Sequence, residues 1–424
     1  MKNQDVKFET LYKVPSRNGV YKPEKYHGSG WRIVNMGELF HYNFIGNQEM
    51  NRVQLTNTEM RSSNLEDGDL LFGRRSLVEE GAGKCSIVIN PIEPLTFESS
   101  IIRVRVDKKK VNPLFLFYYF TTNQGRGRIK AIVSGVNVKG IRGSDLKNIS
   151  LTLPYNDLDG QNKLVSIISS YDDLINTNRR RIQLLEEAAR LLFREWFVYF
   201  HFPRLRQGFG VQAGHEKAKI VDRDRRKMPA GWDYLLFTKI KLFKKAPLGV
   251  QVFTDIRQYY QTSEIDGTSI AGNGEEVDYE NRPSRADIEP RINTIYFAKM
   301  KDTDKVLYFN KGNSDLLEKI LLSTGMVGFT TDEKYLGFLF GLLTSYEFIQ
   351  YKNNYATGAT QVSLNDGSLK KIKVIFPTID LVEPYSEIVN PLLEECSYLR
   401  NQNQKLAQAR DLLLPRLMSG AIEV

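Results

Sequence analysis

The stretch SGVNVKGIRGSDLKNISLTLP, residues 134–154, decides the fold, because TGATQVSLNDGSLKKIKVIFP, residues 357–377, repeats its pattern 223 positions later without a gap. In both stretches a small residue and a glycine precede a Gly-Ser turn, a Leu-Lys-x-Ile segment, a short strand and a proline. The apolar and polar alternation in residues 149–153 is typical of a half-buried strand. The chain therefore contains an internal duplication.

A seven-residue apolar repeat follows each proline, with positions spaced four and three residues apart. Its first copy comprises Leu164, Ile168, Tyr171, Ile175, Asn178, Ile182, Leu185, Ala189, Leu192 and Trp196. Its second copy comprises Tyr385, Val389, Leu392, Cys396, Leu399, Asn403, Leu406, Arg410, Leu413 and Leu417. Such a repeat predicts a coiled coil. The alternative is two amphipathic helices, each packed on its own domain.

Each repeat contains one asparagine, and an asparagine in a coiled-coil seam often determines the register of the helices. If the two helices run antiparallel with level ends, Leu164 faces Leu417 and Asn178 faces Asn403. We expect the first helix to cover residues 157–199, a length of about 60 Å, and the second to be somewhat shorter.

Two segments of similar size remain outside the helices, and both have a mixed α/β pattern. In the first segment we predict strands at 31–34, 70–72, 86–89 and 101–106, and helices at 112–121 and 124–132. In the second we predict strands at 294–299 and 306–309, and helices at 315–322 and 334–351. The predicted domains are a first head (1–154), a central helix (155–200), a basic linker with a second head (201–377) and a C-terminal helix (378–424).

Composition favours an anionic partner. The 424 residues carry a formal net charge of +9, and nucleic acid is the commonest anionic partner of such a chain. The two cysteines, Cys85 and Cys396, form no disulfide framework, so a reducing compartment is expected. Because we find neither a signal peptide nor a membrane span, a cytoplasmic location is predicted.

Motifs for catalysis are missing from the sequence. It has no Pro-Pro and therefore no adenine-methyltransferase tetrapeptide, and it has no phosphate-binding loop of the ATPase type. Residues 81–84, GAGK, lack the first glycine of that loop and continue with a cysteine. The histidines His27, His41, His201 and His215 have no metal-ligand spacing. We therefore predict that the chain has no catalytic site, binds no metal and holds no cofactor of its own.

Four stretches together resemble the specificity (S) subunits of type I restriction-modification systems, the HsdS family. Residues 28–39 (GSGWRIVNMGEL) are similar to the family's opening strand, and residues 68–88 (GDLLFGRRSLVEEGAGKCSIV) are similar to its Gly-Asp-Leu-Leu-Phe hairpin. Residues 185–200 (LEEAARLLFREWFVYF) resemble its central region, and residues 412–424 (LLLPRLMSGAIEV) its distal one. The resemblance covers nearly the whole chain. The second head departs from it, since no Gly-Asp-hydrophobic hairpin is evident there.

The resemblance implies a fold of two target recognition domains of mixed α/β type, separated by two long helices that form an antiparallel coiled coil. It implies that each head recognises one half of a bipartite, asymmetric DNA site and that the helix pair sets the spacer. The implied partners are double-stranded DNA, two methyltransferase subunits that use S-adenosylmethionine, and two restriction subunits that use ATP and Mg²⁺. The pseudo-twofold duplication would seat two identical partners.

Candidate DNA contacts are cationic, amide and hydroxyl side chains in polar loops, because such groups bind base edges and phosphates. In the first head they are Arg74, Arg75, Lys108, Lys109, Arg126, Arg128, Asn137, Lys139 and Arg142. In the second head they are Arg257, Tyr259, Arg285, Arg291, Lys311, Lys352, Asn354, Thr360 and Gln361. For each residue the alternative is an ordinary solvated side chain. We rank residues 126–142 and 352–361 highest, because they occupy equivalent places in the duplication.

Other functions remain open at this point. The chain could serve a fused methyltransferase-nuclease, act alone as a DNA-binding protein, or be an enzyme whose carboxylates follow no motif. For Trp196, Phe197 and Phe200, at the end of the first helix, we favour a core contact between helix and head over a methyltransferase contact. The basic stretch 201–230 is interpreted as a linker or arm.

Overall fold

The computed structural model describes residues 4–77, 81–205, 211–215, 220–223, 226–358 and 362–423. It divides into two compact units, and each is described by itself: unit 1 comprises Met1–Ile175 and Lys405–Val424, and unit 2 comprises Asn176–Gln404. Each unit therefore contains one head together with parts of both long helices, whereas the sequence-based boundaries separate heads from helices.

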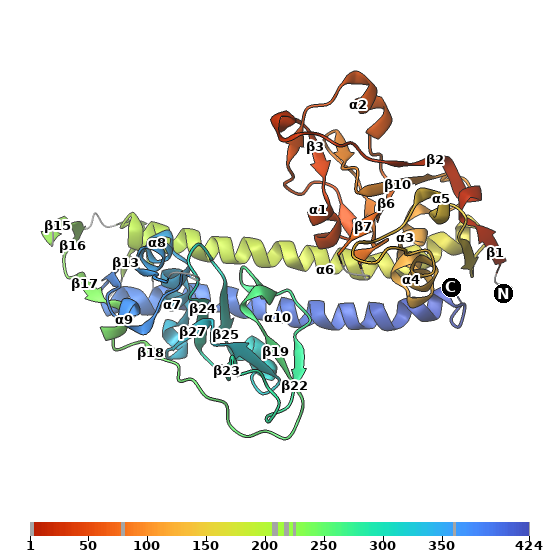
Figure 1. The fold of residues 1–424 in the computed structure, drawn as a ribbon. Coiled ribbons are helices and arrows are strands. Elements are labelled where there is room, and N and C mark those ends of the chain that lie inside the picture. Colours follow the sequence, from red (N-terminus) through yellow and green to blue (C-terminus); the bar gives the residue numbers. More distant parts are fainter. Residues whose placement is uncertain are drawn as a thin grey trace. The chain divides into compact units, whose positions relative to one another are not determined.

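The head of unit 1 is built on a five-stranded mixed sheet in the order β2-β10-β6-β8-β4 (Figure 1). These strands are β2 (Tyr12–Asn18), β10 (Ile101–Val106), β6 (Leu70–Gly73), β8 (Cys85–Val88) and β4 (Phe44–Ile45). A second sheet contains β5 (Arg52–Val53), β3 (His27–Val34) and β9 (Leu95–Phe97), while β1 (Gln4–Lys7) pairs with β12 (Ser150–Leu153) and β7 (Arg75–Ser76) with β11 (Lys139–Gly140). Its helices are α1 (Met36–His41), α2 (Asn57–Ser63), α3 (Pro113–Thr121), α4 (Asn123–Lys130) and α5 (Gly143–Leu146).

The head of unit 2 contains two four-stranded sheets. The first has the order β18 (Lys244–Lys245), β27 (Met326–Thr330), β24 (Thr294–Ala298) and β25 (Val306–Phe309). The second has the order β22 (Glu275–Val277), β19 (Arg257–Tyr260), β26 (Ile320–Ser323) and β23 (Ala286–Ile288). Shorter pairs are β17 (Asp233–Leu236) with β28 (Lys373–Phe376), and β20 (Ile265–Asp266) with β21 (Ser269–Ile270). The helices are α7 (Leu336–Thr344), α8 (Tyr346–Tyr355) and α9 (Asp366–Leu369).

The duplication is confirmed element by element. Helices α3, α4 and α5 and strand β12 of unit 1 have the order of α7, α8, α9 and β28 of unit 2, and their lengths are equal except that α4 has 8 residues and α8 has 10. The sheet order β2-β10-β6-β8 matches β18-β27-β24-β25. In both heads the final strand pairs antiparallel with the opening strand, and a buried phenylalanine, Phe8 or Phe237, follows that opening strand.

The hairpin that the sequence did not reveal in the second head is β24–β25. In unit 1, β6–β8 follows Gly68, whose φ is +88°, and the buried carboxylate of Asp69 binds Arg105 on β10 through two hydrogen bonds of 2.7 Å. In unit 2 the corresponding residues are Asn293, whose φ is +52°, and Thr294, whose hydroxyl lies 2.8 Å from that of Thr330. A pair of hydroxyl groups therefore replaces the ion pair.

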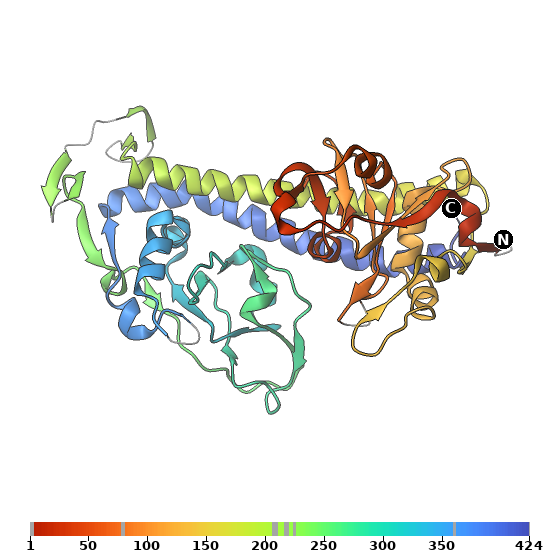
Figure 2. The ribbon, with the colours of Figure 1, turned by 45° about the horizontal axis from the view of Figure 1, so that its top comes forward.

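The two long helices are α6 (Leu158–Phe193), continued by a π-helical turn at Arg194–Val198, and α10 (Ile379–Met418). They run antiparallel within each unit (Figures 1 and 2). In unit 2 the Asn178 side chain donates to the Asn403 amide oxygen at 3.0 Å and to Gln402 at 2.8 Å. In unit 1 Leu164 and Leu417 lie in the same core cluster. The predicted opposition of Asn178 and Asn403 is confirmed. The first helix covers 36 residues and its π-helical turn 5 more, and the second helix covers 40, so the second is shorter by one residue.

Two helix predictions in the second head were wrong. Residues 315–322 form the end of a 3₁₀ helix (Lys311–Leu316) followed by β26, whose four residues are all buried. Residues 334–351 form two helices rather than one, because the Ser345 hydroxyl accepts a hydrogen bond from Phe348 N at 3.2 Å and caps a new helix.

The predicted linker contains β13 (Pro203–Leu205) paired with β14 (Val211–His215), and β15 (Ile220–Arg223) paired with β16 (Arg226–Pro229).

Candidate nucleic-acid interface

Each head has an isolated antiparallel bridge at the duplicated stretch. In unit 1 an antiparallel bridge between Ser134 and Gly140 closes the loop, and in unit 2 a bridge between Thr357 and Ser363 does so. The first residue inside each loop is a glycine with positive φ, +109° at Gly135 and +142° at Gly358. A side chain there would strain the backbone, so both positions favour glycine.

Sheet pairing brings several of the predicted contact residues of the first head together. Strand β11, which ends the loop, pairs with β7, so that Lys139 lies opposite Ser76 and Gly140 opposite Arg75. Asn137, inside the loop, is exposed. Among the described residues, Arg75, Lys139 and Arg142 have no hydrogen-bonded or ion-paired side-chain partner. These cations are therefore available to an anionic ligand.

Other candidates of the first head already have partners. The Arg126 guanidinium donates to Gly83 O at 2.8 Å and thereby fixes the turn before β8. Arg74 donates to Ser99 O at 3.4 Å, Arg128 donates to the Thr152 hydroxyl at 3.1 Å, and Lys108 forms an ion pair of 2.8 Å with Asp67. Lys109 is exposed. Arg126 is thus a residue that positions the protein backbone, and the others lie at or near the surface.

Three candidates of the second head are buried, and the structure corrects their expected exposure. Tyr259 is 2% exposed and packs in a small apolar core. Arg257 is 8% exposed and forms an ion pair of 2.8 Å with Glu289, and Lys352 is 2% exposed. The sequence predicts all three to lie in exposed loops, but all three side chains are buried in the head. The sequence alone does not distinguish a polar residue in the core from a polar residue in a loop.

The remaining candidates of the second head divide into two groups. Arg285, Arg291 and Asn354 are exposed. Lys311 is also exposed, but it forms ion pairs with Glu333 at 3.1 Å and with Glu394 of α10 at 3.0 Å. Thr360 and Gln361 lie outside the described residues, so their role as DNA contacts stays a prediction.

Lys352 bridges two backbone carbonyl groups within the second head. Its ammonium group donates to Met300 O at 2.8 Å and to Thr303 O at 2.5 Å, and so holds the turn between β24 and β25. Burial lowers the pKa of Lys352 from 10.5 to about 8, although Asp302 and Asp304 oppose this shift. The charge is therefore costly to keep inside the head.

This pKa predicts a pH dependence of stability. Because the unfolded chain binds the Lys352 proton more tightly than the folded chain, the contribution of Lys352 to stability is lowest below about pH 8 and rises as the pH increases towards 10.5, above which the side chain is neutral in both states. We expect the difference in free energy of unfolding between wild type and Lys352→Met to shift in favour of wild type from pH 7 to pH 10, in urea titrations. The exposed neighbour Lys301, changed to Met, is the control. Parallel pH profiles of wild type and Lys352→Met would contradict the assignment.

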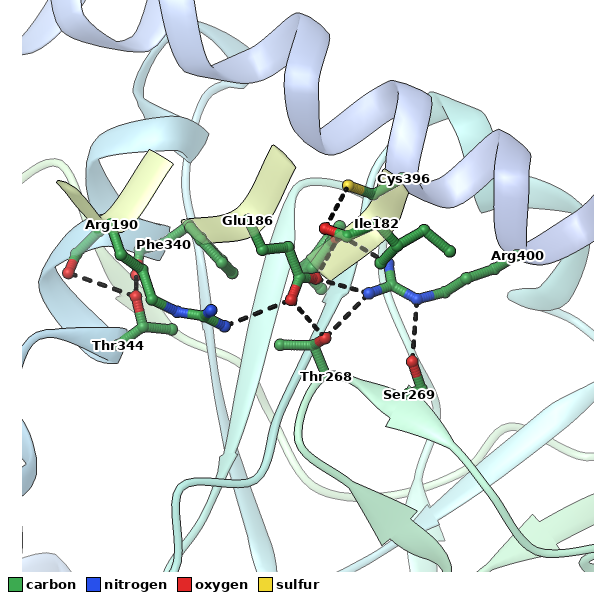
Figure 3. Close-up of polar contacts among 11 residues, drawn as sticks. Ile182, Glu186, Arg190, Thr268, Ser269, Phe340, Thr344, Cys396 and Arg400 are labelled. Carbon is green, nitrogen blue, oxygen red and sulfur yellow. Dashed lines mark hydrogen bonds and ion pairs between the residues drawn. The ribbon is translucent and has the colours of Figure 1, made fainter. Parts of the chain in front are cut away.

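A buried polar cluster joins the head of unit 2 to both long helices (Figure 3). Glu186 of α6 accepts hydrogen bonds from Arg400 of α10 at 2.5 Å, from Thr268 at 2.8 Å and from Tyr308 of β25 at 3.0 Å. Arg400 also donates to Ser269 at 3.2 Å. Burial raises the pKa of Tyr308 well above its usual value, so its hydroxyl stays protonated and donates to the carboxylate. This cluster anchors the second head.

Unit 1 contains a cluster of the same chemistry. Asp172 of α6 accepts a hydrogen bond from Tyr118 of α3 at 2.7 Å and forms an ion pair with Arg410 of α10. In each unit, a carboxylate of α6, an arginine of α10 and a tyrosine of the head therefore meet. Arg410 was predicted only as a seam position, and sequence gave no signal for the carboxylate and tyrosine partners, which are far away along the chain.

Neither a metal centre nor a membrane helix is found in the part of the chain that the structure describes. No group of three or more His, Cys, Asp or Glu side chains among those residues is placed to hold a metal ion. None of the helices described is long and apolar enough to cross a membrane.

The fold defines a class of protein: a duplicated chain of two units, each with one mixed α/β head and parts of an antiparallel helix pair. A model of the family "Type I restriction modification DNA specificity domain" matches residues 30–187. The chain is 22% identical over 442 aligned positions to the HindI specificity subunit of Haemophilus influenzae, covering 92% of this chain and 94% of that one. It is 23% identical to the MjaIX specificity subunit of Methanocaldococcus jannaschii, over 83% of each chain.

A solved structure supports the fold. The S subunit of a type I restriction-modification system from M. genitalium is 14% identical, with a TM-score of 0.53 over 99% of both chains. Residues 30–187 thus match the type I restriction-modification specificity domain, and most of the chain is similar to type I specificity subunits.

Proposed function

We propose that this chain directs a methyltransferase to a two-part DNA sequence, with each head recognising one half of the site. The observation that carries the proposal is the duplicated loop, which in the first head gathers Arg75, Lys139 and Arg142 without partners among the described residues. Cations of this kind bind phosphates or guanine edges. The net charge of +9 supports an anionic partner.

The proposed assembly contains two methyltransferase subunits and two restriction subunits on one specificity chain. The two-fold pattern of the duplication supports a pair of identical partners. In this proposal S-adenosylmethionine is held by the methyltransferase subunits, and ATP with Mg²⁺ by the restriction subunits. The chain itself performs no chemistry, the antiparallel helices set the spacer between the half-sites, and the complex acts on DNA in the cytoplasm.

A salt titration tests the proposed contact. We expect Lys139→Ala to reduce the slope of log affinity against log salt for a duplex by about one if Lys139 binds phosphate. If Lys139 binds a base edge, sequence preference relaxes at one position instead. Lys147→Ala, on the same head beside Glu9 at 3.8 Å, is the matched control. An unchanged slope together with an unchanged sequence preference would remove Lys139 from the interface.

A further inference from the structure

The face of the unit 1 sheet around Arg103 carries more positive than negative charge. Arg103 of β10 lies directly opposite Arg17 of the edge strand β2, and its partner on the other side, Leu71 of β6, is apolar. Residues directly opposite on antiparallel strands have Cβ atoms about 5 Å apart, and like charges in that position are destabilising. Some other feature must therefore account for this pair of arginines.

Nearby carboxylates do not neutralise the pair. Arg105, two residues further along β10, binds Asp69 through two hydrogen bonds of 2.7 Å and also forms an ion pair with Glu66. Arg103 is only 7% exposed, its Nε has no hydrogen-bond partner, and no residue described in the structure forms an ion pair with it or with Arg17. Burial lowers the pKa of Arg103, and the neighbouring Arg105 and Arg17 also lower it, while Asp69 and Glu66 oppose them.

Two other buried arginines, Arg32 and Arg257, each have a carboxylate partner. Arg32 is 5% exposed and lies 3.8 Å from the Glu93 carboxylate. Arg257 is 8% exposed and lies 2.8 Å from Glu289. Since both have a carboxylate partner and Arg103 has none among the described residues, the missing counter-charge distinguishes Arg103.

The duplication shows that the fold does not require an arginine at this position. In the matching sheet of unit 2, β27 pairs with β24 as β10 pairs with β6, and the residue that corresponds to Arg103 is Gly328. A Cβ atom on Gly328 would lie 2.4 Å from the ring of Tyr296, which fills the space. One copy of the sheet therefore folds with no side chain where the other keeps a buried, unpartnered guanidinium.

We propose that Arg17 and Arg103 form an anion site on the β2–β10 face of the first head (Figure 1) and that its ligand is a phosphodiester of the DNA backbone. A phosphate accepts hydrogen bonds from two guanidinium groups and removes the repulsion between them. The site rests on the proposed DNA-binding function and adds a contact outside the loops. Because the matching position of the second head has no cation, the site belongs to the first head alone.

The test uses the full-length chain and a fluorescent 40-base-pair duplex of mixed sequence, titrated between about 50 and 300 mM salt. Each lost phosphate contact lowers the salt slope by about 0.9. We expect Arg17→Ala to lower the slope by about one, and Arg17→Ala combined with Arg103→Met to lower it by about two with an affinity loss of tenfold or more at low salt. Arg52→Ala, on the same head and paired with Glu93 at 2.7 Å, should leave the slope unchanged.

Thermal unfolding separates a binding role from a structural one. Since Arg103→Met replaces an unpartnered buried charge by an apolar side chain of similar length, we expect the melting temperature to stay the same or rise. A lower melting temperature with unchanged DNA binding would make Arg103 structural and overturn the proposal. If the variants bind DNA normally but lose association with the methyltransferase subunit, the ligand is a protein carboxylate, which also overturns it. If wild type itself does not bind the duplex, the proposed function fails rather than this site alone.

Discussion

Arg400→Ala is expected to lower the free energy of unfolding of unit 2 by about 3–5 kcal/mol, which is the usual cost of removing one partner of a buried ion pair. Arg400 neutralises Glu186, whose side chain is 6% exposed. Without Arg400, the carboxylate keeps Thr268, Tyr308 and the more distant Arg190 at 3.3 Å. Those groups satisfy its hydrogen bonds, but they leave its charge poorly compensated.

Urea unfolding followed by tryptophan fluorescence measures this loss, because two of the three tryptophans, Trp196 and Trp232, lie in unit 2. The matched control is Arg181→Ala. Its ion pair with Glu395 also joins α6 to α10, but the two side chains are 53% and 43% exposed, so a change below about 1 kcal/mol is expected. The double variant Glu186→Gln, Arg400→Met should recover much of the loss. Equal stabilities of Arg400→Ala and the control would contradict the anchoring role of the cluster.

Phe197→Ala is expected to cost about 3–5 kcal/mol, as for other large-to-small changes of buried aromatic residues. Phe197 is 6% exposed. Its ring centroid lies 5.0 Å from that of Phe338, 5.1 Å from that of Tyr385 and 5.9 Å from that of Trp232. These partners come from α7, α10 and the loop before β17, so the side chain joins the end of α6 to the head.

The same fluorescence assay measures the effect of Phe197→Ala. Leu191→Ala, on the same helix at 44% exposure, is the control and should change stability by less than about 1 kcal/mol. Normal stability of Phe197→Ala combined with loss of methyltransferase association would instead assign Phe197 to a partner contact. The burial of Trp196 and Phe197 confirms the core contact that the sequence analysis favoured for them.

The sequence predicted what depends on periodicity and repetition. The heptad positions identified the helix pair and the opposition of Asn178 and Asn403, because register follows from spacing along the chain. The repeat identified strand β12 and its counterpart β28, and it predicted a turn where the short helices α5 and α9 form. The hydrophobic strands of the first head, such as β6 and β10, were placed within a residue of their bounds.

What the sequence did not predict depends on contacts between distant residues. Lys352 and Tyr259 were assigned to loops, since only the packed head shows that their neighbours bury them. The 3₁₀ turn before β26 was assigned to a helix, because an apolar run such as residues 320–322 suits a helix and a buried strand equally well. The unpartnered state of Arg103 also became visible only when the pairing of β2 with β10 was known.

The central claim, that each head of this chain recognises one half of a split DNA site, is tested most directly by mapping N6-methyladenine. The chain would be co-expressed with its proposed methyltransferase partner in a host free of methylation, and the genome of that host would be sequenced by a single-molecule method. We predict one motif with two specified halves, a fixed unspecified spacer and one methylated adenine in each half. Methylation of a continuous motif, or none from a soluble complex, would contradict the claim.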